Sequence, residues 1–262
     1  MKILVTVKEV AEVADDFEID GDEVADQYVE YDLNEWDDYA IEAAVQIAEE
    51  GDDVEVVSAT IGPERSEETI RMALAKGVDR AVRVWDDALE GAELDVAARA
   101  RLVGRVAERE EPDLILTGVQ ASDTGFGATG VALAESLGYE WAAVVNHLEL
   151  EAGDPAAAVR RELEGGVEEL TEVELPAVLT IQTGINEPRY ASLRGIRQAQ
   201  RKEIDHQTLA DLGLDESAVD TPIRRTAMYE PESESDAEYF EGDAGEQASQ
   251  LAETLRTQGV VQ

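Results

Sequence analysis

Apolar residues recur along the first half of the chain in two alternating patterns. Short, mostly apolar runs, typical of buried β-strands, occupy residues 3–7, 54–59, 81–85 and 114–116. Apolar side chains spaced three or four apart predict helices over residues 34–51, 66–76, 94–110 and 127–137. Strands that alternate with helices in this way predict a parallel sheet with helices on both faces.

Beyond residue 142 the pattern changes. Residues 146–150 and 163–173 alternate apolar and polar side chains, with Gly165-Gly166 as a turn, which predicts antiparallel strands. Residues 175–182 form one more apolar run. We expect this block to extend the same sheet.

The last part of the chain has a different character from the rest. A non-globular stretch begins near Ile204 and ends in a short amphipathic helix over residues 245–258. The predicted fold is therefore α/β, with a Rossmann-like, mostly parallel sheet in residues 1–203 and an extended C-terminal arm in residues 204–262.

Two local features precede and open the first predicted helix. Residues 9–33 show little helical periodicity, and Asp20-Gly21-Asp22 within them predicts a hairpin. Asn34 is a typical helix N-cap residue, and the acidic residues that follow it favour the first turn of a helix.

The surface charge is extreme. The chain has 61 acidic and 21 basic residues, a formal net charge of −40, yet 44% of its residues are apolar and recur periodically, which indicates a folded protein. Because the acid excess is spread along the whole chain, we expect a high-salt cytoplasm, where screening makes the self-repulsion tolerable. An ordinary acidic protein with an acidic tail is the alternative. Either surface repels nucleic acid and anionic membranes.

Composition also limits the chemistry. The absence of cysteine excludes disulfides, thiolate metal sites and cysteine catalysis, and two histidines argue against a histidine-rich metal site. No apolar run approaches the roughly 20 residues that cross a bilayer. The N-terminus enters a strand pattern directly, without signal-peptide features. We therefore expect a soluble cytoplasmic protein without a metal site or membrane insertion.

A glycine-rich segment after the run at 114–116 is the first candidate site. Small residues let the backbone approach a ligand closely, and the N–H groups at the start of the next helix can hold a phosphate. In open α/β sheets ligands lie beyond the carboxyl ends of the strands, where this segment falls. An ordinary glycine-rich turn is the alternative, since the segment is neither GxGxxG nor a Walker loop. The candidate residues are Gly118, Gln120, Ala121, Ser122, Asp123, Thr124, Gly125, Phe126, Gly127, Ala128 and Thr129.

The second candidate is the start of the first predicted helix. Trp36 places a large aromatic ring beyond a strand end, where it can cover the ring of a ligand. A tryptophan in the core is the alternative.

The third candidate is a basic island. Residues 186–202 hold five basic residues and one acidic residue, a local charge of +4 in a chain of −40. Leu193 and Ile196 are apolar residues that can anchor a partner, and arginine is frequent in interface hot spots. The alternative is a structural helix that neutralises neighbouring acids.

These segments, in this order, resemble the β subunit of electron transfer flavoproteins. The most specific match is Leu-Pro-Ala-Val at 175–178, followed by Asn-Glu-Pro-Arg-Tyr-Ala-Ser-Leu at 186–193. The opening Val-Thr-Val-Lys at 5–8, the helix start at 34–42 and residues 62–80 are also similar to the family pattern. The resemblance covers essentially the whole chain.

The resemblance implies an electron-carrier subunit rather than an enzyme. Such a β subunit pairs with a larger α subunit, with which it shares an FAD, and itself binds AMP or, in electron-bifurcating members, a second FAD. It carries electrons between flavin dehydrogenases and a quinone-linked or ferredoxin-linked acceptor. The acidic arm of residues 204–262 would pack on the α subunit.

The resemblance also implies residue roles. The nucleotide site would include the glycine-rich residues above together with Thr6, Asn34, Glu35, Trp36, Asp37 and Ile61. The partner dehydrogenase would dock on Leu193, Arg194, Ile196 and Arg197. The roles of Arg189 and Tyr190 are not deducible from the sequence.

Two departures from the family pattern matter. Glu35 and Trp36 stand where the family often has proline and phenylalanine, and Trp36 keeps an aromatic surface there. The loop reads Asp-Thr-Gly-Phe at 123–126 instead of an acid-rich run, which leaves AMP or a second FAD open.

Two other classes of function remain open on the residues alone. A nucleotide-processing hydrolase or ligase would favour a P-loop lysine or paired Mg²⁺ carboxylates near the glycines, and only Asp123 is present there. A non-redox adenine-nucleotide sensor on the same fold is the other. The donor dehydrogenase, the acceptor and the flavin potential are not encoded in these patterns.

Overall fold

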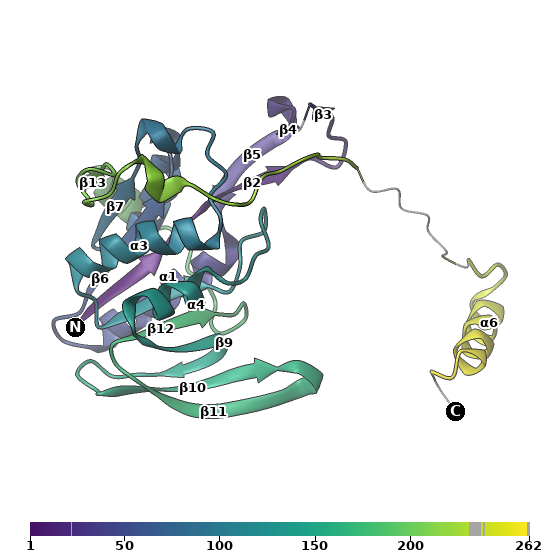
Figure 1. The fold of residues 1–262 in the computed structure, drawn as a ribbon. Coiled ribbons are helices and arrows are strands. Elements are labelled where there is room, and N and C mark those ends of the chain that lie inside the picture. The colour runs from purple at the N-terminus through teal and green to yellow at the C-terminus, as the bar shows by residue number, and fades with distance from the viewer. Residues whose placement is uncertain (22, 231–236, 238, 261–262) are drawn as a thin grey trace. The chain divides into compact units, whose positions relative to one another are not determined.

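A mostly parallel sheet organises the larger part of the protein (Figure 1). Among the described residues it has nine strands. In spatial order they are β11 (Val167–Glu174), β10 (Ala156–Leu163), β9 (Glu140–Glu149), β12 (Ala177–Ile181), β8 (Leu114–Gly118), β1 (Lys2–Thr6), β6 (Glu55–Ile61), β7 (Arg80–Val84) and β13 (Ile204–Gln207). All neighbours pair in parallel except β10, which is antiparallel to both β9 and β11. The predicted mostly parallel α/β fold is confirmed, and the block after residue 142 does extend the same sheet.

Helices cover both faces of this sheet. The helices are α1 (Glu35–Glu50), α2 (Glu67–Lys76) and α5 (Leu193–Ala199) on one face, and α3 (Val96–Glu110) and α4 (Thr129–Leu137) on the other. The alternation of side chains along β1 shows the two layers, because Ile3 and Val5 lie in the core beneath α1 and α2, whereas Leu4 lies in the core beneath α3. This burial on both faces is why apolar residues dominate both faces of the parallel strands.

Two small antiparallel ribbons carry the chain from β1 to α1. β2 (Glu9–Val13) pairs with β5 (Val29–Leu33), and β3 (Ile19–Asp20) pairs with β4 (Glu23–Val24) as the predicted hairpin requires. Asp22, at the predicted turn, lies outside the described residues. Single-turn 3₁₀ helices lie at Asp26–Tyr28, Glu64–Ser66, Asp87–Leu89, Glu164–Gly166 and Glu216–Val219.

The structure describes residues 1–21, 23–230, 237 and 239–260. The chain divides into two compact units, Met1–Ala227 and Met228–Gln262. The first unit therefore extends beyond the boundary at residue 203 that we predicted. The physical reason is that β13 pairs in parallel with β7, and that Leu209 and Leu212 are buried in the same core as α3. The second unit contains α6 (Ala244–Thr257), which Asp243 and Glu246 begin with a capping box.

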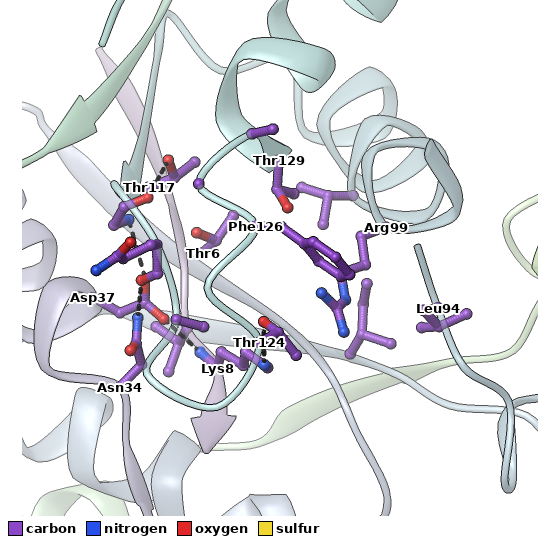
Figure 2. Close-up of a pocket in the computed structure, with 18 of the residues that line it drawn as sticks. Thr6, Lys8, Asn34, Asp37, Leu94, Arg99, Thr117, Thr124, Phe126 and Thr129 are labelled. Carbon is purple, nitrogen blue, oxygen red and sulfur yellow. Dashed lines mark hydrogen bonds between the residues drawn. The ribbon is translucent and has the colours of Figure 1, made fainter. Parts of the chain in front are cut away.

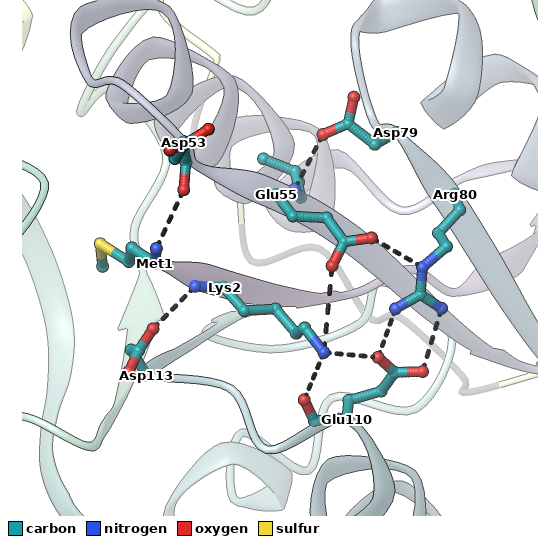
Figure 3. Close-up of polar contacts among 9 residues, drawn as sticks. Met1, Lys2, Asp53, Glu55, Asp79, Arg80, Glu110 and Asp113 are labelled. Atoms are coloured by element: carbon teal, nitrogen blue, oxygen red, sulfur yellow. Dashed lines mark hydrogen bonds and ion pairs between the residues drawn. The ribbon is translucent and has the colours of Figure 1, made fainter.

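A network of ion pairs joins the amino ends of the central strands to the end of α3 (Figure 3). Glu110 accepts hydrogen bonds from Arg80 Nη1 at 3.0 Å and from Lys2 Nζ at 3.2 Å, and a further one from Arg80 Nη2. Glu55 accepts from Arg80 Nε at 2.8 Å. The Glu110 side chain is only 11% exposed, and the hydrogen bonds from Arg80 hold its pKa below the ordinary value of 4.5 despite burial.

We predict that Glu110→Gln destabilises the protein by about 1–2 kcal/mol, because two cations lose a nearly buried carboxylate. Solvent at Arg80 keeps the loss at the lower end of that range. Since the folded pKa of Glu110 is depressed, this stabilisation is present above the pKa of the unfolded chain and disappears as the pH falls through the folded pKa. Urea denaturation at fixed salt, from neutral pH downward, measures it.

Glu108→Gln is the matched control. Glu108 lies in the same helix and pairs with an arginine, Arg105, three residues earlier, but the side chains of this pair are 51% and 43% exposed. Its loss should cost no more than about 0.5 kcal/mol. Equal effects of the two substitutions would contradict the assigned role of Glu110.

Candidate functional site

A pocket of about 210 Å³ opens at the carboxyl ends of β1, β6 and β8 (Figure 2). This is the edge at which parallel sheets present ligand sites. Twelve of the residues predicted for the nucleotide site line it, namely Thr6, Asn34, Asp37, Ile61, Gly118, Gln120, Ala121, Thr124, Phe126, Gly127, Ala128 and Thr129. The structure therefore brings together segments that lie more than 100 residues apart in the sequence.

Asp37 joins the strand ends that line the pocket. Its carboxylate is 4% exposed and accepts a hydrogen bond from the backbone N–H of Lys8, after β1, at 2.9 Å. Its other oxygen accepts from the N–H of Gly118, at the end of β8, at 3.0 Å. Burial raises the pKa of Asp37 to about 7, and these hydrogen bonds act in the opposite direction. One side chain at the start of α1 thus fixes the ends of two adjacent strands.

Gly118 is required for this contact. A Cβ atom there would lie 2.6 Å from Trp36 Cβ and 2.7 Å from Asp37 Oδ1. Any side chain at this position would therefore separate β8 from the start of α1. The close approach explains the glycine better than a demand for an unusual backbone angle does.

Asn34 occupies the predicted N-cap position but forms no side-chain cap hydrogen bond. Instead its Nδ2 donates to Gln120 O at 2.9 Å, and its Oδ1 accepts from the N–H of Ser122 at 3.4 Å. Asn34 is therefore the N-cap residue by position, as predicted, but its side chain does not cap the helix. The physical reason is that backbone groups of the glycine-rich segment compete with the helix N–H groups for this side chain. Asn34 fixes that segment from the opposite wall.

The glycine-rich segment ends in free backbone donors. Gly125 and Gly127 adopt φ angles of 60° and 59°, which L side chains rarely take. Within the described part of the chain, the N–H groups of Gly127, Ala128 and Thr129 meet no acceptor. Free donors at the start of α4 are suited to an anion, since the helix dipole favours negative charge there.

Two cations face the pocket from different elements. Lys8 pairs with Asp123 and lies 3.4 Å from Thr124 Oγ1. Arg99, on the first turn of α3, lies 5.8 Å from the centre of the Phe126 ring. Figure 2 shows Phe126 and Arg99 on one side of the pocket, with Asn34 and Asp37 on the other.

Five predicted residues do not line the pocket. Glu35 is exposed, and the Trp36 indole donates to Gln182 Oε1 at 3.1 Å, so its ring is held beside Gly118 instead of over the pocket. Asp123 pairs with Lys8. Ser122 bonds Asn34, and Gly125 turns the loop. Their assignment to a nucleotide site stays a prediction.

Sequence reasoning missed nine lining residues, which are Val7, Lys8, Ala59, Ala92, Leu94, Arg99, Val103, Thr117 and Val119. Val7 ends the first apolar run and Lys8 follows it, whereas Thr117 and Val119 flank Gly118, so their position at strand ends was a usable signal. No sequence signal pointed to Arg99, because its position depends on how α3 packs over the sheet.

The four predicted docking residues all lie on α5. Leu193 is 77% exposed, and Arg194, Ile196 and Arg197 are exposed as well. A Cβ at Gly195 would lie 2.3 Å from Ala75 O, so this glycine lets α5 lie directly on α2. The apolar residues of the basic island therefore face outward on a helix that is itself well supported.

Arg189 has a structural role that the sequence did not reveal. Its Nε donates to Glu42 Oε2 at 2.7 Å and its Nη1 to Glu49 Oε1 at 2.6 Å, both on α1. Glu42 is buried, and Asn186 donates to Tyr39 O at 3.0 Å. These bonds tie the segment before α5 to α1, while Tyr190 is left fully exposed.

In the part of the chain that the structure describes, no helix is long and apolar enough to cross a membrane. The same residues form no cluster of three or more side chains suited to a metal ion.

The fold and the pocket define an open α/β protein with a ligand pocket at the carboxyl edge of a parallel sheet. A family model described as "Electron transfer flavoprotein domain" matches residues 23–212. An electron transfer flavoprotein subunit beta from Methylophilus methylotrophus is 48% identical over 261 residues, which cover 97% of this chain and 98% of that protein. The subunit beta from Bacillus subtilis is 32% identical over the full length of both chains. The human subunit beta is 35% identical over 244 residues, 90% of this chain and 94% of that protein.

The chain therefore belongs to the electron transfer flavoprotein family, among its β subunits. It is an electron-carrier protein and not an enzyme. The resemblance predicted from the sequence is confirmed, and the hydrolase or ligase alternative is set aside.

We predict that Asp37→Asn lowers the free energy of unfolding by about 1–3 kcal/mol at pH 8, where the carboxyl group is ionised. The two hydrogen bonds of Asp37 come from the backbone N–H groups of Lys8 and Gly118. An asparagine side chain has one acceptor oxygen, so its NH₂ group would face one of these N–H donors. Urea denaturation at constant salt measures the loss. Glu35→Gln, in the same first turn but exposed, should change the value by less than about 0.5 kcal/mol; comparable losses would contradict the role of Asp37.

Proposed function

We propose that this chain is the β subunit of a heterodimeric electron transfer flavoprotein. Its partner would be the α subunit, with which it shares an FAD, and the flavin supplies the electron chemistry. The chain itself positions groups and performs no bond-making step. Membership of the family supports this proposal.

We further propose that the pocket binds an adenine nucleotide, AMP or a second FAD. The observation that carries this proposal is the set of free N–H groups at the start of α4, beside two cations, Lys8 and Arg99. These groups suit a phosphate. Ile61, Leu94 and Val103 give the pocket apolar walls that suit a purine ring.

The docking of a flavin dehydrogenase on Leu193, Arg194, Ile196 and Arg197 is also proposed. An exposed leucine surrounded by arginines has the composition of an interface anchor with a polar rim. The quinone-linked or ferredoxin-linked acceptor, the packing of the acidic arm on the α subunit, the cytoplasmic location and the high-salt setting stay predictions.

Counting cofactors tests the central proposal. The chain should be co-expressed with its α subunit, the complex denatured, and FAD and AMP quantified per heterodimer by chromatography. We expect one FAD with one AMP, or two FAD. A complex with one FAD and no other adenine nucleotide would contradict the nucleotide pocket, and a failure to form a complex would contradict the subunit assignment.

For the docking surface, we predict that Leu193→Ala weakens electron transfer with the partner dehydrogenase by roughly 5- to 150-fold, as expected for a hot spot of about 1–3 kcal/mol. Cofactor content and thermal stability should stay nearly unchanged, since an exposed side chain supports little of the core. Steady-state kinetics of the heterodimer with the dehydrogenase measures the effect.

Leu170→Ala provides a matched control, because Leu170 is 79% exposed and lies on β11, outside the docking segment. It should leave the kinetics with the dehydrogenase unchanged. If Leu193→Ala instead unfolds the protein or removes its nucleotide while the remaining folded fraction reacts normally, Leu193 is not a docking residue.

A further inference from the structure

Arg99 differs from the other arginines of this protein in its environment. Among the described residues, every other arginine that is buried or partly buried donates a side-chain hydrogen bond or forms an ion pair; those arginines are Arg71, Arg80, Arg83, Arg105, Arg160, Arg161 and Arg189. Arg99 is partly buried and does neither. In a chain with 61 acidic residues, it is unusual that no carboxylate of the described residues forms an ion pair with this guanidinium.

The described residues offset the cost of this arrangement only in part. Burial lowers the pKa of Arg99 from its ordinary value, and the more distant charges of Asp123 and Asp95 only partly oppose this. A partly desolvated cation without a hydrogen-bonded partner is unfavourable. The face of Phe126 gives some compensation, of the cation–π kind. The guanidinium nevertheless retains all of its N–H donors.

The position of Arg99 indicates which kind of group its guanidinium N–H donors can bind. The side chain lines the pocket from α3, whereas the free backbone donors come from the start of α4 (Figure 2). Lys8 is already paired with Asp123. The carboxylate of Asp37 accepts two backbone N–H groups. Among the described residues that line the pocket, Arg99 is therefore the cation without a hydrogen-bonded carboxylate.

We propose that Arg99 is a specificity-determining residue of the nucleotide pocket, whose guanidinium binds the phosphate portion of the bound nucleotide. The inference rests on the proposed function, since it assigns a residue to that pocket. A guanidinium suits phosphate because its planar donors can bond two oxygens at once. The ligand class is therefore the adenosine 5′-phosphates, whether the phosphate belongs to a mononucleotide or to a pyrophosphate.

The experiment compares ligands with and without phosphate. The heterodimer, freed of nucleotide by dialysis, is titrated with adenosine, AMP and ADP by calorimetry at one salt concentration. Arg99→Gln should weaken AMP and ADP by about 10- to 100-fold, the range expected for hydrogen bonds to a charged group. Adenosine should change by less than about twofold, because it offers no phosphate to Arg99. A larger loss for ADP than for AMP would place the contact at the second phosphate, and equal losses would place it at the first.

Two further variants make the result specific. Arg105→Gln, on the same helix but paired with exposed Glu108, should leave all three affinities unchanged. Arg99→Lys keeps the charge and loses the planar fork, so its affinity for AMP should be intermediate. If Arg99→Gln does not fold, Arg99→Lys carries the test through the ratio of AMP to adenosine affinity.

The outcomes separate this inference from the proposed function. If the wild-type complex binds AMP or ADP and Arg99→Gln binds them equally well, Arg99 is not a phosphate ligand although the nucleotide pocket stands. If adenosine is weakened as much as AMP, Arg99 shapes the pocket without contacting phosphate, and the inference is wrong. If the wild-type complex binds none of the three ligands, both the pocket assignment and this inference fail.

Discussion

The buried carboxylate of Asp37 is the interaction on which the site depends. It joins the backbone just after β1 to the end of β8 at the first turn of α1, and it does so in a place that solvent does not reach. Two requirements follow from it. Position 118 has to be glycine, because a side chain would push β8 away, and Asn34 is left free to hold the glycine-rich segment instead of capping its own helix. The pocket is thus shaped by backbone contacts before any ligand arrives.

The distribution of charge separates structural from functional cations. Lys2 and Arg80 at the amino edge of the sheet, and Arg189 near α5, are each surrounded by carboxylates and stabilise the packing of elements. The exposed arginines of α5 and the partly buried Arg99 lack such partners among the described residues. In a protein with three acids for each base, a cation without an acidic neighbour is the informative one.

The sequence predicted the α/β class and most strand and helix positions, because the buried parallel strands are mostly apolar runs and the helices carry apolar side chains on one face. It did not predict β13, since Ile204–Gln207 has only four residues and only partial burial at a sheet edge. For the site, the glycine-rich segment and Thr6 lie at the carboxyl ends of parallel strands. The topology of the sheet brings these ends together. Trp36 and Arg99 were misjudged or missed because their orientation depends on tertiary packing: Trp36 bonds Gln182, and Arg99 meets Phe126 only after α3 lies on the sheet.

The bonds of Arg189 to α1, and of Asn186 to Tyr39, have a consequence for association. They immobilise the backbone that leads into α5 in the free protein, and the close contact of Gly195 with α2 does the same for the helix itself. Leu193 is therefore presented on a scaffold whose conformational entropy was already lost on folding. Ordering a flexible loop commonly opposes binding, so a surface fixed in advance meets its partner with little entropic penalty beyond that of the side chains themselves.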